Sequence, residues 1–228
     1  ANEFITAGAG FIGTNLAARY LKKWNNVTIF HNFSRRGSEF NAEWLKKNYP
    51  NVKVIHGDMR SKEDINNALA DNCDFCFHLA GQVAVTTSVA NPLEDFEVNC
   101  LGTVNLLEAI RKSENDPVFV YSSTNKVYGE MEGAEVIENK NRYEYANLPD
   151  GIDESFPIDF HSPYGCSKGA ADQYTRDYAR IYGLNSIVFR QSCIYGYHQF
   201  GIEDQGWLAW FIIQSVLKRP ITIFGDGK

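Results

Sequence analysis

The chain has 228 residues, of which 44% are hydrophobic and 14% aromatic, and its formal net charge is −6. This length and composition suit one large domain with a substantial core, and the acidic balance excludes a general nucleic-acid binder, which would present a basic face. No apolar run reaches the roughly 18 residues that cross a membrane, and no secretory signal is visible. We therefore expect a cytoplasmic protein without a membrane partner.

The first 31 residues predict a strand over 3–6, a glycine-rich turn over Ala7–Gly13, a helix and a second strand over 27–30. The helix is expected to bury a face made of Ile12, Leu16, Tyr20 and Trp24. In this context the helix start offers free N–H groups to a pyrophosphate, which Gly10 lets approach, while Gly13 lets the helix pack on the strand. The alternative is a glycine-rich turn without a ligand.

Helices and strands then alternate, which predicts an α/β fold with a doubly wound parallel sheet of the Rossmann type. Further helices are expected over 41–49, 61–70, 92–112 and 162–183, and strands over 52–56, 75–80, 117–121 and 185–190. The inward face of the longest early helix is expected to carry Phe96, Val98, Leu101, Val104, Leu107 and Ile110. Ligands bind at the carboxyl ends of such strands, so we expect one crevice faced by Gly8–Phe11, Asp58, Gly81–Gln82 and Ser123–Thr124.

The five cysteines are scattered rather than arranged as a disulfide framework. Cys73 and Cys76 have the spacing of a redox or zinc motif, but no second pair follows, and an apolar run begins beside them. We interpret them as buried strand thiols and predict no metal site.

The later part of the chain departs from the alternation. Residues 128–157 are polar and too long for an ordinary connection, so we expect a functional excursion near the active site. A helix over 207–218 and the start of a strand at 221–224 follow. We divide the chain into a dinucleotide-binding domain, 1–190, and the start of a smaller substrate-binding portion, 191–228, which is incomplete as written.

Tyr164 and Lys168 lie four residues apart at the start of a helix that Ser162 can cap, with Pro163 at the first helical position. A phenol, with a pKa of about 10, is a poor base at neutral pH, and we expect the Lys168 ammonium to lower the pKa of Tyr164. Taken alone, this spacing more often marks a half-buried aromatic residue beside a solvated lysine.

Several motifs occur together in a characteristic order: Ala9–Gly13, His78–Ala80, Asn99 with Gly102–Thr103, Tyr121–Thr124 with Val127–Gly129, and Tyr164 with Lys168. Over almost its whole length the chain thereby resembles the extended short-chain dehydrogenase/reductase family, in its branch of NAD-dependent epimerases and dehydratases of nucleotide sugars. A narrower resemblance, carried by 78–84, 122–129, 159–174 and 204–207, is to enzymes that use NAD to invert C2 of a CDP-linked 3,6-dideoxyhexose. It implies a CDP-sugar substrate and a role in lipopolysaccharide O-antigen biosynthesis.

The resemblance implies that Tyr164 takes the C2 hydroxyl proton, that Thr124 orients this hydroxyl, and that Lys168 also binds the nicotinamide ribose. The implied dinucleotide contacts are Gly8, Gly10, Phe11, Ile12, Gly13, His31, Asn32, Ser34, Arg35, Asp58, Met59, Leu79, Ala80, Gly81, Gln82, Asn99, Ser122, Tyr164 and Lys168. The implied substrate contacts are Gln82, Val83, Thr124, Asn125, Lys126, Tyr164, Ser192, His198 and Gln199. A homo-oligomer, a dimer or a tetramer, is implied as well.

Three positions depart from the family pattern. Ala7 stands in place of the first glycine of the turn, which costs on the order of 1 kcal/mol if its φ is positive. His31 replaces the acidic residue that binds the adenosine ribose, and Arg35 and Arg36 can favour a 2′-phosphate, so we expect weakened NAD affinity and NADP as a possible cofactor. His198 replaces an arginine expected to meet the substrate diphosphate.

Two other functions remain open. Asn125–Lys126 occupies the place of the Asp-Glu pair of the dehydratases of this fold, which argues against dehydration. A UDP-hexose 4-epimerase would share the cofactor, Tyr164 and Lys168. A non-catalytic dinucleotide-binding module, such as a redox-sensing regulator, would explain Ala7 and His31 but would not need the catalytic residues together.

Overall fold

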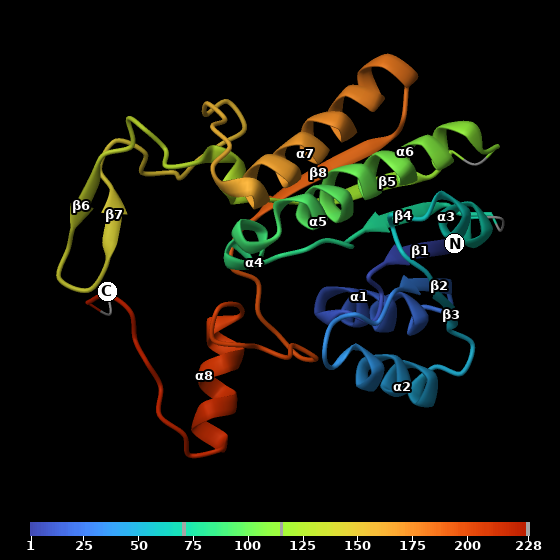
Figure 1. The fold of residues 1–228 in the computed structure, drawn as a ribbon, viewed down its shortest axis with the longest axis horizontal. Helices are drawn as coiled ribbons and strands as arrows, with labels where there is room; N and C mark the ends of the chain where they lie inside the picture. Colours follow the sequence, from blue (N-terminus) through green and yellow to red (C-terminus); the bar gives the residue numbers. More distant parts are fainter. Residues whose placement is uncertain (70–71, 115, 227–228) are drawn as a thin grey trace.

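The computed structural model describes residues 1–69, 72–114 and 116–226. Its centre is a six-stranded parallel sheet in the order β3-β2-β1-β4-β5-β8 (Figure 1). The strands are β1 Asn2–Thr6, β2 Asn26–His31, β3 Lys53–His56, β4 Phe75–His78, β5 Val118–Thr124 and β8 Ser186–Gln191. The strand order reverses between β1 and β4, where doubly wound sheets bind ligands, and the predicted fold class is confirmed.

Helices cover both faces of this sheet. On one face lie α1 Phe11–Leu21 and α2 Ser38–Asn48, over a core that includes Ile5 and Leu45. On the other lie α3 Lys62–Ala68, α6 Gly102–Lys112 and α7 Ser162–Tyr182, over a core that includes Leu106 and Phe119. The predicted α3 cap is present, since Ser61 Oγ accepts a hydrogen bond from the Asp64 N–H; Ala70, its predicted last residue, lies outside the described residues.

Two predicted buried faces were wrong in part, although Leu107 and Ile110 are buried and Leu16 and Tyr20 pack against the core as predicted. Trp24 is 94% exposed in the turn after α1, whose small residues Gly13, Ala17 and Ala18 lie against the sheet instead. The predicted helix over 92–112 is interrupted by a π-helical turn, so it comprises α5 Pro92–Phe96, η1 Glu97–Leu101 and α6. The wider turn rotates the buried face, which leaves Phe96 and Leu101 exposed. The sequence also missed α4, Val85–Ala90.

The excursion after β5 begins with η2 Asn125–Tyr128 and forms a hairpin of β6 Val136–Glu138 and β7 Tyr143–Tyr145, which projects from the main body (Figure 1). The chain ends with α8 Trp207–Val216 and an extended segment that reaches the hairpin, where Tyr143 donates a hydrogen bond to Asp226 at 2.6 Å. The strand predicted at 221–224 is wrong, because no strand among the described residues pairs with that segment.

The prediction of buried thiols agrees with the structure, although only Cys76 lies in a strand, β4, and Cys73 precedes it. Burial raises the pKa of Cys73 to about 11. Among residues 1–69, 72–114 and 116–226, no group of histidine, cysteine and acidic side chains is arranged to hold a metal ion. In the same ranges, no helix combines the length and the apolar character needed to cross a membrane.

Candidate active site

A cleft of about 450 Å³ opens at the carboxyl ends of β1, β2 and β4. Fourteen of the predicted dinucleotide contacts line it: Gly10, Phe11, Ile12, Gly13, His31, Asn32, Ser34, Arg35, Asp58, Met59, Leu79, Ala80, Gly81 and Gln82. Val83, His198 and Gln199, predicted for the substrate, line it as well. The cleft therefore lies at the strand ends where the sequence predicted a crevice, and the dinucleotide contacts themselves stay a prediction.

The glycine turn is built for close approach of a ligand to the backbone. A Cβ at Gly13 would stand 2.4 Å from the Ala7 carbonyl oxygen, and one at Gly8 would stand 2.3 Å from the Ile29 side chain, so glycine is required at both positions. No side chain caps α1 at Gly10, which leaves the first N–H groups of the helix available to an anion. These features fit the pyrophosphate of a dinucleotide.

Ala7 adopts φ 51°, in the left-handed region, and its carbonyl accepts a hydrogen bond from the Gly10 N–H at 2.8 Å. An L-residue with a Cβ is strained there, because left-handed backbone costs about 1–2 kcal/mol. The departure from the glycine pattern therefore introduces the strain expected from the sequence.

Ala7→Gly should stabilise the protein by about 0.5–1 kcal/mol, since relief of strain exceeds the extra flexibility that glycine gives the unfolded chain. Thermal unfolding should shift upward by about 2–4 °C. Ala9→Gly is the control, because Ala9 is buried without a positive φ, and this change should destabilise. An Ala7→Gly melting temperature equal to or below that of the unchanged chain would contradict the strain argument.

His31 ends β2 at the cleft, where it is 7% exposed. Neither ring nitrogen has a hydrogen-bond partner among the described residues, and Phe33 packs edge-on against the ring at 4.9 Å. Burial lowers the pKa of His31 to about 4, so the imidazole is neutral at pH 7. A buried ring with two unsatisfied nitrogens fits a ligand hydroxyl, such as that of a ribose, because such groups are normally hydrogen-bonded.

Acidification below pH 6.5 should destabilise the fold. Burial lowers the pKa values of His31 and His78, the latter to about 3, so between pH 6.5 and those values the unfolded chain binds protons that the folded chain does not. For His31 this amounts to about 2 kcal/mol between pH 6.5 and 5. Urea unfolding at pH 7.5 and 5.0 should show a smaller loss in His31→Gln than in the unchanged chain. Equal losses in both proteins would contradict this assignment.

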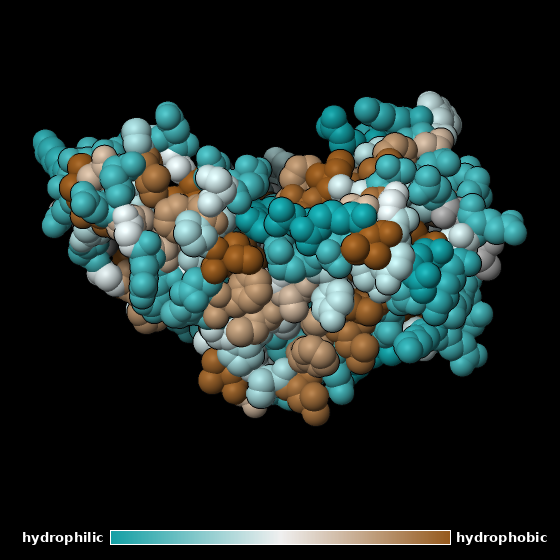
Figure 2. All heavy atoms as spheres, turned by 90° about the horizontal axis from the view of Figure 1, so that it is seen from above, coloured by the Kyte–Doolittle hydropathy of each residue, from teal (hydrophilic) through white to brown (hydrophobic). Residues whose placement is uncertain are grey.

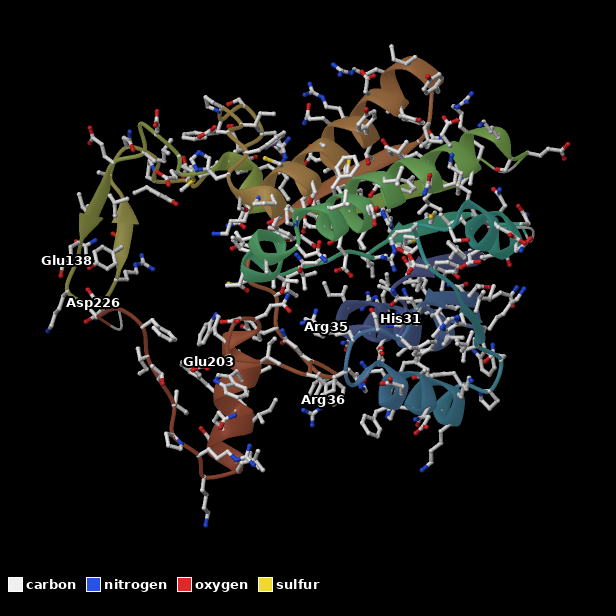
Figure 3. All side chains as sticks on the ribbon, viewed as in Figure 1. His31, Arg35, Arg36, Glu138, Glu203 and Asp226 are labelled. Carbon is white, nitrogen blue, oxygen red and sulfur yellow. The ribbon has the colours of Figure 1, made fainter. Side chains whose placement is uncertain are left out.

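The end of the cleft beside His31 carries positive charge. Arg35 and Arg36 line it on the connection between β2 and α2 (Figure 3), and neither has an ion-pair partner among the described residues. Arg35 donates a hydrogen bond to the Gln205 side chain, in the loop before α8. Asp58, on the same wall, is paired with Arg60 at 2.7 Å, which holds the pKa of this carboxyl low.

The loop between β8 and α8 crosses this cleft. Asn15 of α1 donates a hydrogen bond to the Tyr197 carbonyl at 2.7 Å, and Asn41 of α2 donates to the His198 carbonyl at 3.2 Å. The His198 ring packs on Trp44 with centroids 4.3 Å apart. His198 therefore belongs to the wall made with α2, and its contact with a substrate diphosphate stays a prediction.

The predicted catalytic residues lie one strand further along, behind the loop after β4. Tyr164 and Lys168, on the first turns of α7, are 9% and 6% exposed, and Thr124, at the end of β5, is 6% exposed. A hydrogen bond joins the side chains of Thr124 and Tyr164. A Cβ added to Gly81 would stand 3.8 Å from Lys168 Nζ, so this amine lies directly behind the cleft wall.

The local sequence positions this group as expected. Pro163 occupies the first turn of α7, and Ser162 Oγ accepts a hydrogen bond from the Gly165 N–H at 3.1 Å. Ser162 is the first residue of α7, but its own φ of 65° is left-handed and strained. Ser88 of α4 accepts a hydrogen bond from the Tyr164 N–H at 3.1 Å. The sequence pattern gave no sign of this contact with Ser88.

The prediction that Lys168 lowers the pKa of Tyr164 was wrong for the protein without a bound ligand. Burial raises the pKa of Tyr164, while the hydrogen bond with Thr124 opposes this rise and the charge of Asp95 adds to it. Lys168 Nζ donates instead to the Ser122 carbonyl at 2.5 Å and lies over the Tyr121 ring. Burial lowers the pKa of Lys168 to about 8, so its protonation state changes only slightly above neutral pH.

Some predicted contacts do not reach the cleft. Those expected for the dinucleotide are Gly8, Asn99, Ser122, Tyr164 and Lys168, and those expected for the substrate are Thr124, Asn125, Lys126, Tyr164 and Ser192. Ser123 and Thr124 were also expected to face the crevice, but Ser123 Oγ donates to Asp172 at 2.7 Å, which turns this strand end toward α7. The Gln82 side chain is hydrogen-bonded to Ala84 in its own loop and to Asp95. Gln82 therefore lies on the cleft wall as predicted, but its side chain is already engaged within the protein.

The fold and site define a dinucleotide-binding enzyme with a Thr-Tyr-Lys group beside the cofactor cleft. Residues 4–228 match the NAD dependent epimerase/dehydratase family, and the chain belongs to this family. It is 50% identical to a Salmonella typhi CDP-paratose 2-epimerase, over 98% of this chain and 68% of that one. The chain spans about two thirds of the length of this relative and of the two solved structures described next.

Solved structures agree with this assignment. Pal from Bacillus thuringiensis is 30% identical with a TM-score of 0.82, over 100% of this chain and 67% of that one. The UDP-glucose 4-epimerase of Thermus thermophilus, solved in complex with NAD, is 29% identical with a TM-score of 0.79, over 98% of this chain and 65% of that one.

Proposed function

We propose that this protein is an isomerase, an NAD-dependent epimerase that inverts C2 of a CDP-linked 3,6-dideoxyhexose such as CDP-paratose or CDP-tyvelose. The observation that carries the proposal is Thr124, Tyr164 and Lys168 gathered behind the wall of a dinucleotide cleft, in a chain half identical to a CDP-paratose 2-epimerase. Because a C2 hydrogen without an adjacent carbonyl is not acidic, inversion requires transient oxidation to a 2-keto sugar and re-reduction on the other face.

Each residue has a defined part in this reaction. The glycine turn and the tails of β2 and β4 would hold NAD, which would supply the hydride acceptor. Tyr164 takes the C2 hydroxyl proton and returns it after the sugar has presented its other face. Thr124 orients the reacting hydroxyl through the hydrogen bond it shares with Tyr164, and Lys168 supplies a cation next to the pair.

The first test is to identify the cofactor that the purified protein retains. Denaturation should release NAD, and incubation with CDP-paratose should then give CDP-tyvelose by NMR, with UDP-glucose as the comparison substrate for a 4-epimerase. Conversion of UDP-glucose without conversion of the CDP-sugar would replace this proposal by the 4-epimerase. Release of a nucleotide with no conversion of either sugar would favour the non-catalytic module.

We also propose that NADP binds in this cleft. Two observations support it: Arg35 and Arg36 without ion-pair partners among the described residues, and the neutral His31 in place of the ribose-binding carboxylate. Dissociation constants for NAD and NADP should then lie within roughly tenfold of each other. Tight NAD binding with no measurable NADP binding would refute this.

The remaining features of the proposal concern assembly and location. Exposed apolar side chains on α4, α5 and α7 support a homo-oligomer in which these helices pair: Val89, Leu93, Phe96, Tyr174, Ile181 and Tyr182. Figure 2, which views the molecule from above, shows hydrophobic residues gathered near the middle of the visible surface. We assign residues 191–228 to the substrate-binding portion and the reaction to cytoplasmic O-antigen synthesis.

A further inference from the structure

A buried carboxylate lies beside Tyr164 and Lys168. Asp95, in α5, is 1% exposed. Its Oδ1 accepts hydrogen bonds from Gln82 Nε2 at 2.8 Å and from Asn99 Nδ2 at 3.1 Å, and its Oδ2 accepts one from Ser167 Oγ at 2.5 Å. All three donors are neutral, and no lysine or arginine among the described residues forms an ion pair with Asp95.

These bonds connect Asp95 to both sides of the active site. Ser167 stands between Tyr164 and Lys168 on α7, so the shortest bond of Asp95 holds the turn that presents both residues. Asn99 Oδ1 also accepts a hydrogen bond from the Gln82 N–H at 2.8 Å, which fixes the loop that separates Lys168 from the cleft. The carboxylate is therefore bonded to the two elements that position the pair.

A buried carboxylate needs an opposite charge nearby, because hydrogen bonds from neutral groups do not fully replace its hydration. Lys168 is the nearby cation, and the charges of Asp172 and Asp95 both oppose the burial that lowers its pKa. Asp172 has the larger effect of the two but is itself ion-paired with Arg190 at 3.0 Å, whereas Asp95 has no cationic partner of its own in the part of the chain that the structure describes. The titratable groups that interact with Lys168 are Asp95, Asp172 and His78, with Tyr121 and Tyr164 as its phenolic neighbours.

We propose that Asp95 is the countercharge that keeps the buried Lys168 as an ammonium ion, and that it thereby acts as a positioning residue for Tyr164 and Lys168. The effect on turnover rests on the proposed function, whereas the charge coupling does not. Without the negative charge, burial would lower the pKa of Lys168 further, to near neutral pH, and a large part of the cation beside the phenol would be lost.

The test is a titration of Lys168 by NMR in protein carrying ¹³C-lysine, with its signal assigned by its absence in Lys168→Met. Asp95→Asn should move the Lys168 midpoint down by about one pH unit, because one interacting charge is removed from a low-dielectric site. Ser167→Ala, which removes a hydrogen bond but no charge, should leave the midpoint in place. An unchanged midpoint in folded Asp95→Asn would overturn the proposal.

Turnover gives a second readout. If the ammonium form is required, activity falls as pH rises through the Lys168 midpoint, so Asp95→Asn should keep more of its activity at pH 6 than at pH 8, relative to the unchanged chain. An equal loss at every pH would show a structural role only and overturn the proposal. A shifted midpoint without epimerisation by either protein would sink the proposed function while leaving the charge coupling intact.

If Asp95→Asn alone fails to fold, the proposal is tested by comparing Lys168→Met with the double variant Lys168→Met, Asp95→Asn. Lys168→Met leaves Asp95 as an uncompensated charge, so the double variant with Asp95→Asn should unfold at a higher urea concentration than Lys168→Met alone. A double variant that is no more stable than Lys168→Met would overturn the proposal.

Discussion

Tyr164→Phe should abolish epimerisation, with a loss of about 10²–10⁴-fold or more, because the phenol is the group placed to move the C2 hydroxyl proton. The ring is buried and contacts Thr124 through its hydroxyl, so loss of that single oxygen should leave the fold and the dinucleotide cleft intact. The measurement is the rate of appearance of the C2-inverted sugar nucleotide by NMR, together with the nucleotide content of the purified variant.

Tyr174→Phe is the matched control, since Tyr174 lies on the same helix but is 48% exposed. Its rate should equal that of the unchanged chain. If Tyr164→Phe retains a near-normal rate, proton transfer by Tyr164 is ruled out. If both variants lose activity with their bound nucleotide, the loss reports on cofactor retention instead.

Asp172→Ala should destabilise the protein by about 3–5 kcal/mol, the range for breaking a buried ion pair by removing one partner. Asp172 is 1% exposed and accepts hydrogen bonds from Arg190 Nε at 3.0 Å, Arg190 Nη2 at 3.1 Å and Ser123 Oγ at 2.7 Å. The carboxylate thus joins α7 to β5 and β8, one helical turn beyond Lys168. The free energy of unfolding by urea is the measurement.

Asp177→Ala provides the comparison on the same helix. Asp177 pairs with Arg180 at 2.8 Å, but both side chains are more than half exposed, so its removal should change the stability by less than about 1 kcal/mol. Equal effects of the two substitutions would show that the buried pair contributes no more than a surface pair.

Local patterns predicted the architecture because the hydrophobic periods of strands and helices are read within a few residues. The parallel sheet and the crevice at Gly10, Asp58 and Gly81 followed from that alternation. The exposure of Leu101 could not be predicted, since a π-helical turn shifts the phase of a helix without a sequence signal. The predicted burial of Trp24 was also wrong, because close packing of α1 on the sheet selects small residues.

The electrostatics of the site depended on tertiary contacts. The spacing of Tyr164 and Lys168 suggested a lysine that lowers the tyrosine pKa, but burial dominates both groups and Lys168 donates to the Ser122 carbonyl. Asp95 and Asn99, four residues apart on one helix face, were the one available hint of the buried network. The bond from Ser167 to Asp95 joins segments 72 residues apart, beyond what local pattern can reveal.

The central claim is that C2 is inverted by oxidation and return of the same hydride. The most direct measurement uses CDP-paratose carrying deuterium at C2, incubated with the purified full chain in ordinary water and followed by NMR. The account predicts CDP-tyvelose that retains deuterium at C2, because the hydride never exchanges with solvent. Product with ordinary hydrogen at C2 would contradict the account, since that hydrogen could come only from solvent by proton transfer.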